Sequence, residues 1–155
     1  MNAVRIEAMD PLDPRALQAV NSFLNEMVER VDANALTSDP ADESEGYVEQ
    51  GFFLVAMDDH NRVVGCGALE QVGDGLGQIR RMWVNPVLRG RSIGRRLLSA
   101  LEGAAAVAGL DVIRLEAYEG LTEAILLYET SGYVRSEPEE GAPADLRFYE
   151  KHLEV

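Results

Sequence analysis

The chain alternates between segments with the periodicity of strands and segments with the periodicity of helices. Alternating or short continuous apolar runs are typical of strands, whereas apolar residues three or four positions apart are typical of an amphipathic helix. These patterns predict helices over residues 14–31, 90–108 and 123–130. They predict strands over residues 3–9, 51–57, 63–72, 78–84, 111–118, 133–137 and 146–155.

Local signals support several of these boundaries. Asp13 before Pro14 is a typical helix start, because proline suits the first helical position and aspartate accepts hydrogen bonds from free N–H groups. Gly109 and Gly132 follow predicted helices, where a residue in the left-handed conformation commonly ends a helix. Thr122 is expected to cap the helix that begins after it.

The acidic segment 32–50 has no clear period. A short second helix is expected near its end. Two interpretations of this segment stay open: a solvated connector, or a lid on the substrate side that carries carboxylates.

The order of elements predicts a three-layer α/β fold with a mixed central sheet flanked by helices. Strand 78–84, helix 90–108 and strand 111–118 form a strand–helix–strand unit, and such units almost always join parallel strands by a right-handed crossover. Residues 51–84 are expected to form a meander of three strands. At 155 residues the chain suits a single domain, residues 1–155.

Composition narrows the functional classes. The formal net charge is −13, and such a surface repels nucleic acid and anionic membranes, so neither is an expected partner. It favours cationic partners such as amines, although acidity that merely maintains solubility explains the charge equally well. No apolar run is long enough to span a membrane, the start of the chain lacks a signal-peptide pattern, and the lone Cys66 fits a reducing compartment, so a cytoplasmic location is expected.

The stretch "LRGRSIGRRLL" (residues 88–98) places four arginines and two glycines where a predicted strand leads into a predicted helix. Unpaired N–H groups and the helix dipole make a helix N-terminus favourable for anions, and glycine lets a phosphate approach the backbone. A phosphate or pyrophosphate site is therefore expected, with a solvated basic helix start as the alternative. The patterns of a nucleoside-triphosphate P-loop and of a dinucleotide fold are both missing from the sequence.

The stretch "RMWVNPVLRGRSIGRRLL" (residues 81–98) resembles the acyl-coenzyme A (acyl-CoA) binding motif of the GNAT superfamily of N-acetyltransferases, Q/R-x-x-G-x-G/A. Arg89 occupies its first position and Gly94 its last, while Ser92 replaces the middle glycine. A second stretch, "EAILLYETSGY" (residues 123–133), resembles the family's helix with a leucine–tyrosine pair and a terminal glycine and aromatic residue. The resemblance covers essentially the whole chain.

The resemblance implies acetyl-CoA as the cosubstrate, bound where strands 78–84 and 111–118 splay apart. The pantetheine arm would pair with the exposed end of the first strand like an added strand. The pyrophosphate would lie on the amides of the loop that follows, and arginine side chains would reach the pyrophosphate or the 3′-phosphate. The implied cofactor-binding residues are Met82, Trp83, Val84, Arg89, Gly90, Arg91, Ser92, Ile93, Gly94 and Arg95.

Two of these residues have alternative interpretations. Ser92 is small enough for close approach of a phosphate, and its hydroxyl could donate to a phosphate oxygen or cap the helix. If the position requires a positive φ, cofactor binding should be weaker than with glycine, because serine tolerates that conformation less well. Trp83 is expected in the core, with a place in the wall of the site as the alternative.

Amine acetylation requires stabilisation of the oxyanion, protonation of the leaving thiolate and removal of a proton from the amine. The resemblance assigns the first task to the backbone N–H of Val84 and the second to Tyr128, whose alternative role is packing. Gln78 stands where some relatives carry a glutamate that acts as the general base, so the group that removes the amine proton stays open. Its candidates are Glu70, Glu116, Glu119 and water. No metal is expected, because direct attack by an amine needs none and no ligand cluster has the required spacing.

The sequence therefore predicts an acetyl-CoA-dependent N-acetyltransferase in which a primary amine attacks the thioester directly through a tetrahedral intermediate. A small amine or amino-acid-like metabolite is the expected acceptor. A non-catalytic acyl-CoA sensor or interaction module, or an acetyltransferase for protein lysines or N-termini, is the alternative. The family also suggests a homodimer.

Overall fold

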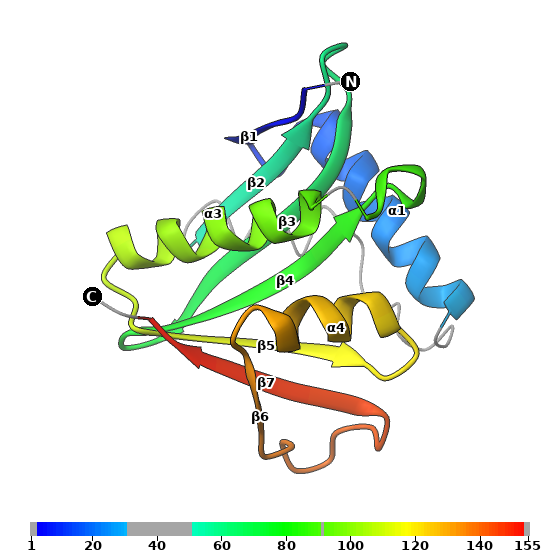
Figure 1. The fold of residues 1–155 in the computed structure, drawn as a ribbon. Helices are drawn as coiled ribbons and strands as arrows, with labels where there is room; N and C mark the ends of the chain where they lie inside the picture. The colour runs from blue at the N-terminus through cyan, green and yellow to red at the C-terminus, as the bar shows by residue number, and fades with distance from the viewer. Residues whose placement is uncertain (1–2, 31–50, 91, 154–155) are drawn as a thin grey trace.

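The computed structural model describes residues 3–30, 51–90 and 92–153 (Figure 1). In chain order, the elements are β1 (Arg5–Ala8), α1 (Pro14–Arg30), β2 (Gly51–Met57), β3 (Val63–Gly73), β4 (Leu76–Val84), the 3₁₀ helix η2 (Pro86–Leu88), α3 (Ile93–Val107), β5 (Val112–Tyr118), α4 (Thr122–Thr130), β6 (Val134–Ser136) and β7 (Leu146–His152). The described strands form one seven-stranded sheet in the order β1-β2-β3-β4-β5-β7-β6. The acidic segment 32–50, with its predicted short helix, lies outside the described residues.

Helices cover both faces of this sheet. Side chains that alternate along β2 show this directly: Leu54 and Ala56 belong to the core that contains α3 and α4, whereas Val55 and Met57 pack with α1. Figure 1 shows α3 and α4 in front of the sheet and α1 behind it. The predicted three-layer α/β arrangement is therefore confirmed.

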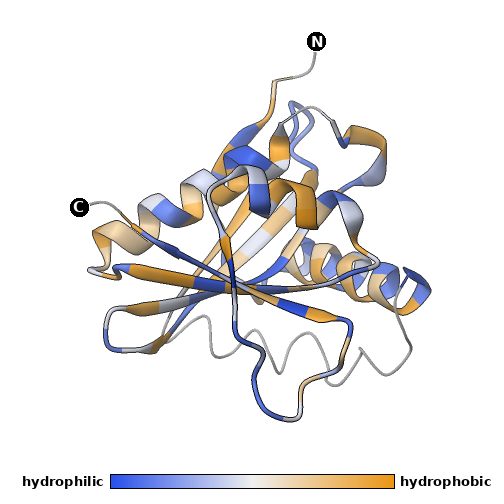
Figure 2. Ribbon diagram, turned by 60° about the horizontal axis from the view of Figure 1, so that its bottom comes forward, coloured by the Kyte–Doolittle hydropathy of each residue, from blue (hydrophilic) through white to orange (hydrophobic). Residues whose placement is uncertain are grey.

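The helix α1 is amphipathic, as the sequence predicted. Its buried residues recur at helical spacing and are Ala16, Ala19, Val20 and Leu24. Figure 2 shows hydrophobic and hydrophilic residues alternating around it. No helix within the described ranges is long and apolar enough to cross a membrane.

Among the described strands, β4 and β5 form the one parallel pair, and this pairing is short. Only three residue pairs join these strands, and the last of them is Gln78 with Arg114. Beyond this point β4 continues to Val84 and β5 continues to Tyr118, where β5 still pairs with β7. The predicted splayed pair is thus confirmed, and among the described strands the carboxyl-terminal half of β4 pairs with β3 alone.

A bulge shapes the free part of β4. The register against β3 shifts between Cys66 and Ala68, and Arg81 on the opposing strand adopts a φ of 61°. Beyond the bulge, Asn85 N donates to Val64 O at 2.8 Å. Because bonded and non-bonded pairs alternate in an antiparallel ladder, Val84 forms a non-bonded pair, and its N–H and C=O point away from β3 toward the opening.

The helix boundaries confirm most of the local signals. Asp13 Oδ1 accepts from Arg15 N at 2.9 Å at the start of α1, and Gly109 (φ 83°) and Gly132 (φ 94°) follow α3 and α4 in the left-handed conformation. The predicted cap of α4 was wrong. Thr122 is the first helical residue, and the residue before it has no side chain that can cap.

Substitution of two glycines should have opposite effects on stability. A Cβ at Gly67 would lie 2.6 Å from Met82 Sδ and 2.8 Å from Leu101 Cδ1, so Gly67→Ala should lower the free energy of unfolding by about 1–3 kcal/mol through overpacking. At Gly103, within α3, a Cβ meets no atom within 4 Å. Gly103→Ala should therefore raise stability by roughly 0.5–1 kcal/mol. Urea unfolding measures both, and a neutral Gly67→Ala would contradict the tight contact.

Candidate active site

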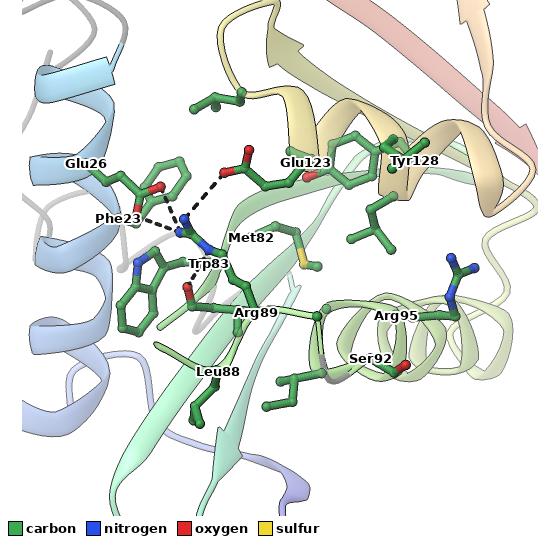
Figure 3. Close-up of a pocket in the computed structure, with 18 of the residues that line it drawn as sticks. Phe23, Glu26, Met82, Trp83, Leu88, Arg89, Ser92, Arg95, Glu123 and Tyr128 are labelled. Atoms are coloured by element: carbon green, nitrogen blue, oxygen red, sulfur yellow. Dashed lines mark hydrogen bonds and ion pairs between the residues drawn. The ribbon is translucent and has the colours of Figure 1, made fainter. Parts of the chain in front are cut away.

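A cleft of about 380 Å³ opens at the point where β4 and β5 separate. It lies between the end of β4, the N-terminus of α3, the length of α4 and the last turns of α1 (Figure 3). The predicted cofactor-binding residues that line it are Met82, Trp83, Val84, Arg89, Gly90, Ser92, Ile93, Gly94 and Arg95. Residues from both faces of the sheet therefore meet in one cavity that passes through the opening.

Gly94 allows three elements to approach one another at the base of this cleft. A Cβ at Gly94 would lie 3.2 Å from Leu127 Cδ2 on α4 and 3.7 Å from Val84 Cγ2 on β4. The last glycine of the motif thus keeps the first turn of α3 close to both walls. Trp83 is half-buried; it packs against the α1 core and also lines the cleft, so both of its predicted roles are present.

The loop before α3 is held in unusual backbone conformations. Gly90 has a φ of 87° and Ser92 a φ of 64°, the region that glycine tolerates best. Ser92 makes no capping hydrogen bond with its side chain, so the expectation that it caps the helix was wrong. The condition for weakened binding, a positive φ at a non-glycine residue, is met. Arg91 lies outside the described residues.

The arginines of the motif do not converge on one point. Arg89 turns toward α1 and α4: its Nη2 lies 2.6 and 2.7 Å from the two carboxylate oxygens of Glu26, and its Nη1 lies 3.4 Å from Glu123. Its Nε donates to Val84 O at 3.1 Å. Figure 3 shows this guanidinium directed away from Ser92 and Arg95. The described partners of the Arg89 guanidinium are therefore two carboxylates and a backbone carbonyl.

Two other arginines contact neutral groups. Arg95 donates to the hydroxyls of Thr130 and Ser131 at 3.0 and 3.3 Å, while Arg96 donates to Val4 O at 2.7 Å on the far side of α3. Within the described part of the chain, Arg95 has no carboxylate partner and lines the cleft. It is the described arginine of the motif that is best placed to meet an anion there.

Arg30 completes an ion network, defined here as Glu26, Arg30, Arg89 and Glu123. Arg30 pairs with Glu26 at 2.9 Å, and it also pairs with both carboxylate oxygens of Glu123. The hydrogen bond from Arg30 lowers the pKa of Glu123 to about 2. Burial raises the pKa of Glu26, but hydrogen bonds from Arg89 and Arg30 outweigh burial and keep the pKa below its usual value. Both glutamates are therefore charged ion-pair partners at neutral pH.

Tyr128 points into the cleft from α4 (Figure 3). It is 5% exposed, and its ring packs near those of Tyr133 and Tyr149. Burial raises the pKa of the Tyr128 phenol, so the hydroxyl stays protonated at neutral pH. A proton donor and the free end of β4 thus line the same cavity.

The three carboxylates considered as bases lie elsewhere. Glu70 pairs with Arg80 and Glu119 with Arg147, each at 3.3 Å. Burial raises the pKa of Glu116, which lies on β5. None of the three lines the cleft as the described residues form it. The structure therefore does not bring these candidates together with the other predicted catalytic residues.

α1 contributes four residues to the cleft, none of which was among the site residues predicted from the sequence. Phe23, Glu26, Met27 and Arg30 all line the cleft. They follow one another at intervals of three, one and three residues, so they share one face of the helix. Such a face mixes apolar and charged residues, and this mixture near the helix end was the available signal.

No candidate metal centre lies within the described ranges, because no group of histidine, cysteine and acidic residues there could hold a metal ion.

A mixed sheet with one splayed parallel pair defines the class of this protein, an α/β protein with the N-acyltransferase fold. The chain matches the family described as "Acetyltransferase (GNAT) family" over residues 19–133. It therefore belongs to the GNAT acetyltransferase family.

Individual relatives agree with this assignment. A relative from Azospirillum brasilense described as "IAA acetyltransferase" is 41% identical over 87 residues, which make up 56% of each chain. A solved structure from Klebsiella pneumoniae, described as an acyl-CoA N-acyltransferase, has a TM-score of 0.79 at 26% identity and covers 97% of both chains. An acetyltransferase from Salmonella typhimurium, solved with its cofactor acetyl-CoA, has the same fold, with a TM-score of 0.74 at 21% identity over 99% of this chain and 95% of that one. The chain spans about half the length of the curated relatives it matches.

Substitutions at Ser92 should reveal the strain at its left-handed φ. Ser92→Gly should raise the free energy of unfolding by up to about 1 kcal/mol, because the left-handed conformation costs about 1–2 kcal/mol for residues with a Cβ and glycine's freedom in the unfolded chain offsets part of the gain. Ser92→Val should lower stability, since β-branched residues tolerate this φ least. Urea unfolding measures both variants. Equal stabilities of all three proteins would contradict a left-handed Ser92.

Acid should weaken the ion network. The folded-state pKa of Glu123 is about 2, below its ordinary value of 4.5, so the ion pair stabilises the protein above about pH 4.5 and this contribution is lost as the pH falls toward 2. Glu123→Gln should flatten the pH dependence of unfolding in that window. Chemical unfolding between pH 2 and 6 measures it, and 0.5 M salt should reduce the difference because it screens exposed charges. Identical slopes for both proteins would contradict the pairing.

Proposed function

We propose that this protein transfers the acetyl group of acetyl-CoA to a primary amine by direct attack. One observation carries the proposal: the free end of β4, with the Val84 N–H facing the opening, shares a cleft with the buried hydroxyl of Tyr128. This arrangement would supply, in one cleft, a donor for a developing oxyanion and a donor for a leaving thiolate.

The cleft fits an extended cofactor with an anionic end. The end of β4 can pair with an amide-bearing arm as it would with a strand, since β5 has left that side. The described residues Gly90, Ser92, Ile93 and Gly94 can present backbone N–H groups to a pyrophosphate at the N-terminus of α3. Among the described arginines, Arg95 would face the phosphates.

The chemistry follows from these positions. The amine nitrogen, with its lone pair free, attacks the thioester carbonyl carbon and pushes charge onto the carbonyl oxygen, which accepts a hydrogen bond from the Val84 N–H. The intermediate collapses with cleavage of the C–S bond, and the Tyr128 hydroxyl donates its proton to the departing sulfur. The attacking nitrogen loses its proton to water, because Glu70, Glu116 and Glu119 lie outside the cleft, and water returns a proton to the Tyr128 phenolate.

The acceptor that best suits the cleft is a small amine with an apolar part. Phe23, Met27 and Trp83 supply apolar walls on the α1 side, while the ion network balances two carboxylates with two guanidiniums and so offers no net charge to a polycation. The name of the Azospirillum relative supports a small-molecule acceptor. A homodimer and a cytoplasmic location stay predictions.

A non-catalytic acyl-CoA sensor is the main alternative, because no base has been assigned. Release of free thiol from acetyl-CoA, measured across a panel of aromatic, aliphatic and amino-acid amines and a lysine peptide, separates these functions. Turnover with a small amine supports the proposal. Tight binding of CoA without turnover on any member would favour the sensor, and turnover on the peptide alone would favour a protein acetyltransferase.

Tyr128→Phe tests the proposed proton donor. It removes only the hydroxyl and keeps the packing of the ring, so kcat should fall by roughly 10²–10⁴-fold while the affinity for CoA stays nearly unchanged. Single-turnover rates on the folded variant measure the chemical step. Tyr149→Phe is a matched control: it removes a hydroxyl that donates to Glu129 at 2.9 Å, and it should lower stability but keep the rate. A Tyr128→Phe rate within about twofold of wild type would return Tyr128 to a packing role.

A further inference from the structure

The ion network joins three walls of the cleft that are far apart in sequence. Glu26 and Arg30 lie on α1, Arg89 lies after η2, and Glu123 lies in the first turn of α4. The side chain of Glu26 is only 18% exposed and that of Arg89 29%. These charges are therefore partly shielded from water. Loss of one partner should destabilise the protein more than it would for a pair of surface charges.

All three guanidinium nitrogens of Arg89 donate hydrogen bonds. Its Nε, Nη1 and Nη2 donate to Val84 O, Glu123 and Glu26 respectively. For Arg89 to bind a phosphate, the guanidinium would have to leave two carboxylates, one of them largely buried. Those same carboxylates would repel the phosphate, because like charges at close range destabilise each other.

The contact with Val84 O fixes one peptide plane at the end of β4. That carbonyl and the Asn85 N–H belong to the same planar peptide unit. The N–H end donates to Val64 O at 2.8 Å, and the carbonyl end accepts from Arg89 at 3.1 Å. With both ends held, the rotation between this plane and the preceding one is restricted, and with it the direction of the Val84 N–H.

We propose that Arg89 is a positioning residue: held by Glu26 and Glu123, its guanidinium fixes the Val84–Asn85 peptide and thereby aims the Val84 N–H into the cleft. It does not bind the phosphates of the cofactor. This inference rests on the proposed function for its effect on catalysis, but the effect on the peptide exists in the protein without any ligand. It also makes the cofactor side of the cleft depend on α1.

The test compares Arg89→Gln, Glu26→Gln and the double variant with Glu29→Gln as the control. Glu29 is an exposed carboxylate on the same helix with no ion pair among the described residues, so Glu29→Gln should behave as wild type. In the ligand-free protein, the ¹⁵N–¹H signal of Val84 should shift in Arg89→Gln and in Glu26→Gln. An unchanged Val84 signal in both variants would overturn the proposal whether or not the protein is an acetyltransferase.

Binding of CoA and of pantetheine, which lacks phosphates, gives the second readout. Arg89→Gln and Glu26→Gln should weaken both ligands by the same factor, and the double variant should lose no more than the stronger single one, because the two residues act as a unit. Arg95→Gln should instead weaken CoA and spare pantetheine. A loss for Arg89→Gln that is confined to CoA would show a phosphate contact and overturn the proposal. Failure of wild type to bind CoA would overturn the proposed function, and the Val84 signal would still decide this inference.

Turnover rates, together with the conservative variant Arg89→Lys, distinguish a positioning role of Arg89 from a role in stability alone. A displaced oxyanion donor should lower kcat by roughly 10–100-fold in Arg89→Gln and in Glu26→Gln, with a smaller change in KM. Arg89→Lys should not restore kcat, because an ammonium cannot span Val84 O and two carboxylates as the planar guanidinium does. Recovery of kcat in Arg89→Lys would show that charge alone suffices. If Arg89→Gln fails to fold, Glu26→Gln carries the same three measurements.

Discussion

The parting of β4 and β5 after Gln78 and Arg114 is the constraint from which the cleft follows. Backbone N–H and C=O groups that are removed from water need partners, and a strand that loses its neighbour leaves a row of them unpaired. β5 avoids this problem by pairing with β7 along its whole length. Among the described strands, no other strand pairs with the end of β4, and the carbonyl of Val84 accepts a hydrogen bond from Arg89 instead. In the proposed function, an extended, amide-bearing ligand would pair with this edge and complete the sheet.

Packing around this opening is as specific as the hydrogen bonding. α3 and α4 approach β4 closely because Gly94 has no side chain to keep Leu127 and Val84 away. The bulge at Arg81 turns the remainder of β4, so that Val84 directs its polar groups to the opening while Trp83 packs toward α1. A cavity with one polar edge and mostly apolar walls results, which is the usual composition of a small-molecule site.

The charged side chains around the cleft form pairs with individual partners and do not gather into one patch of a single sign. Four arginines close together in sequence suggest one concentrated positive patch, yet Arg89, Arg95 and Arg96 contact three different sets of neighbours. Long side chains reach several ångströms from their Cα atoms, so adjacency in sequence says little about where their charges end. In this acidic chain, Glu26 and Glu123 lie close enough to Arg89 to pair with it and hold its side chain in place.

Much of the fold was present in the sequence by itself. The periods of apolar residues predicted the described helices and strands, Gly109 and Gly132 marked helix ends, and the strand–helix–strand unit required a parallel pair. The motif from Arg89 to Gly94 and the helix with Tyr128 indicated the family and two walls of the cleft. These features are local or depend on a general rule of handedness, so they can be recognised without knowing which distant residues meet.

The tertiary structure alone decided which distant residues meet. Glu26 joins Arg89 across 63 positions of sequence, and no local pattern encodes that contact. The left-handed φ of Ser92, the missing side-chain caps at Ser92 and at the start of α4, and the placement of Glu70, Glu116 and Glu119 outside the cleft likewise depend on how whole elements pack. Side-chain partners are chosen by the three-dimensional surroundings, because hydrogen bonds and ion pairs act over a few ångströms whatever the separation along the chain.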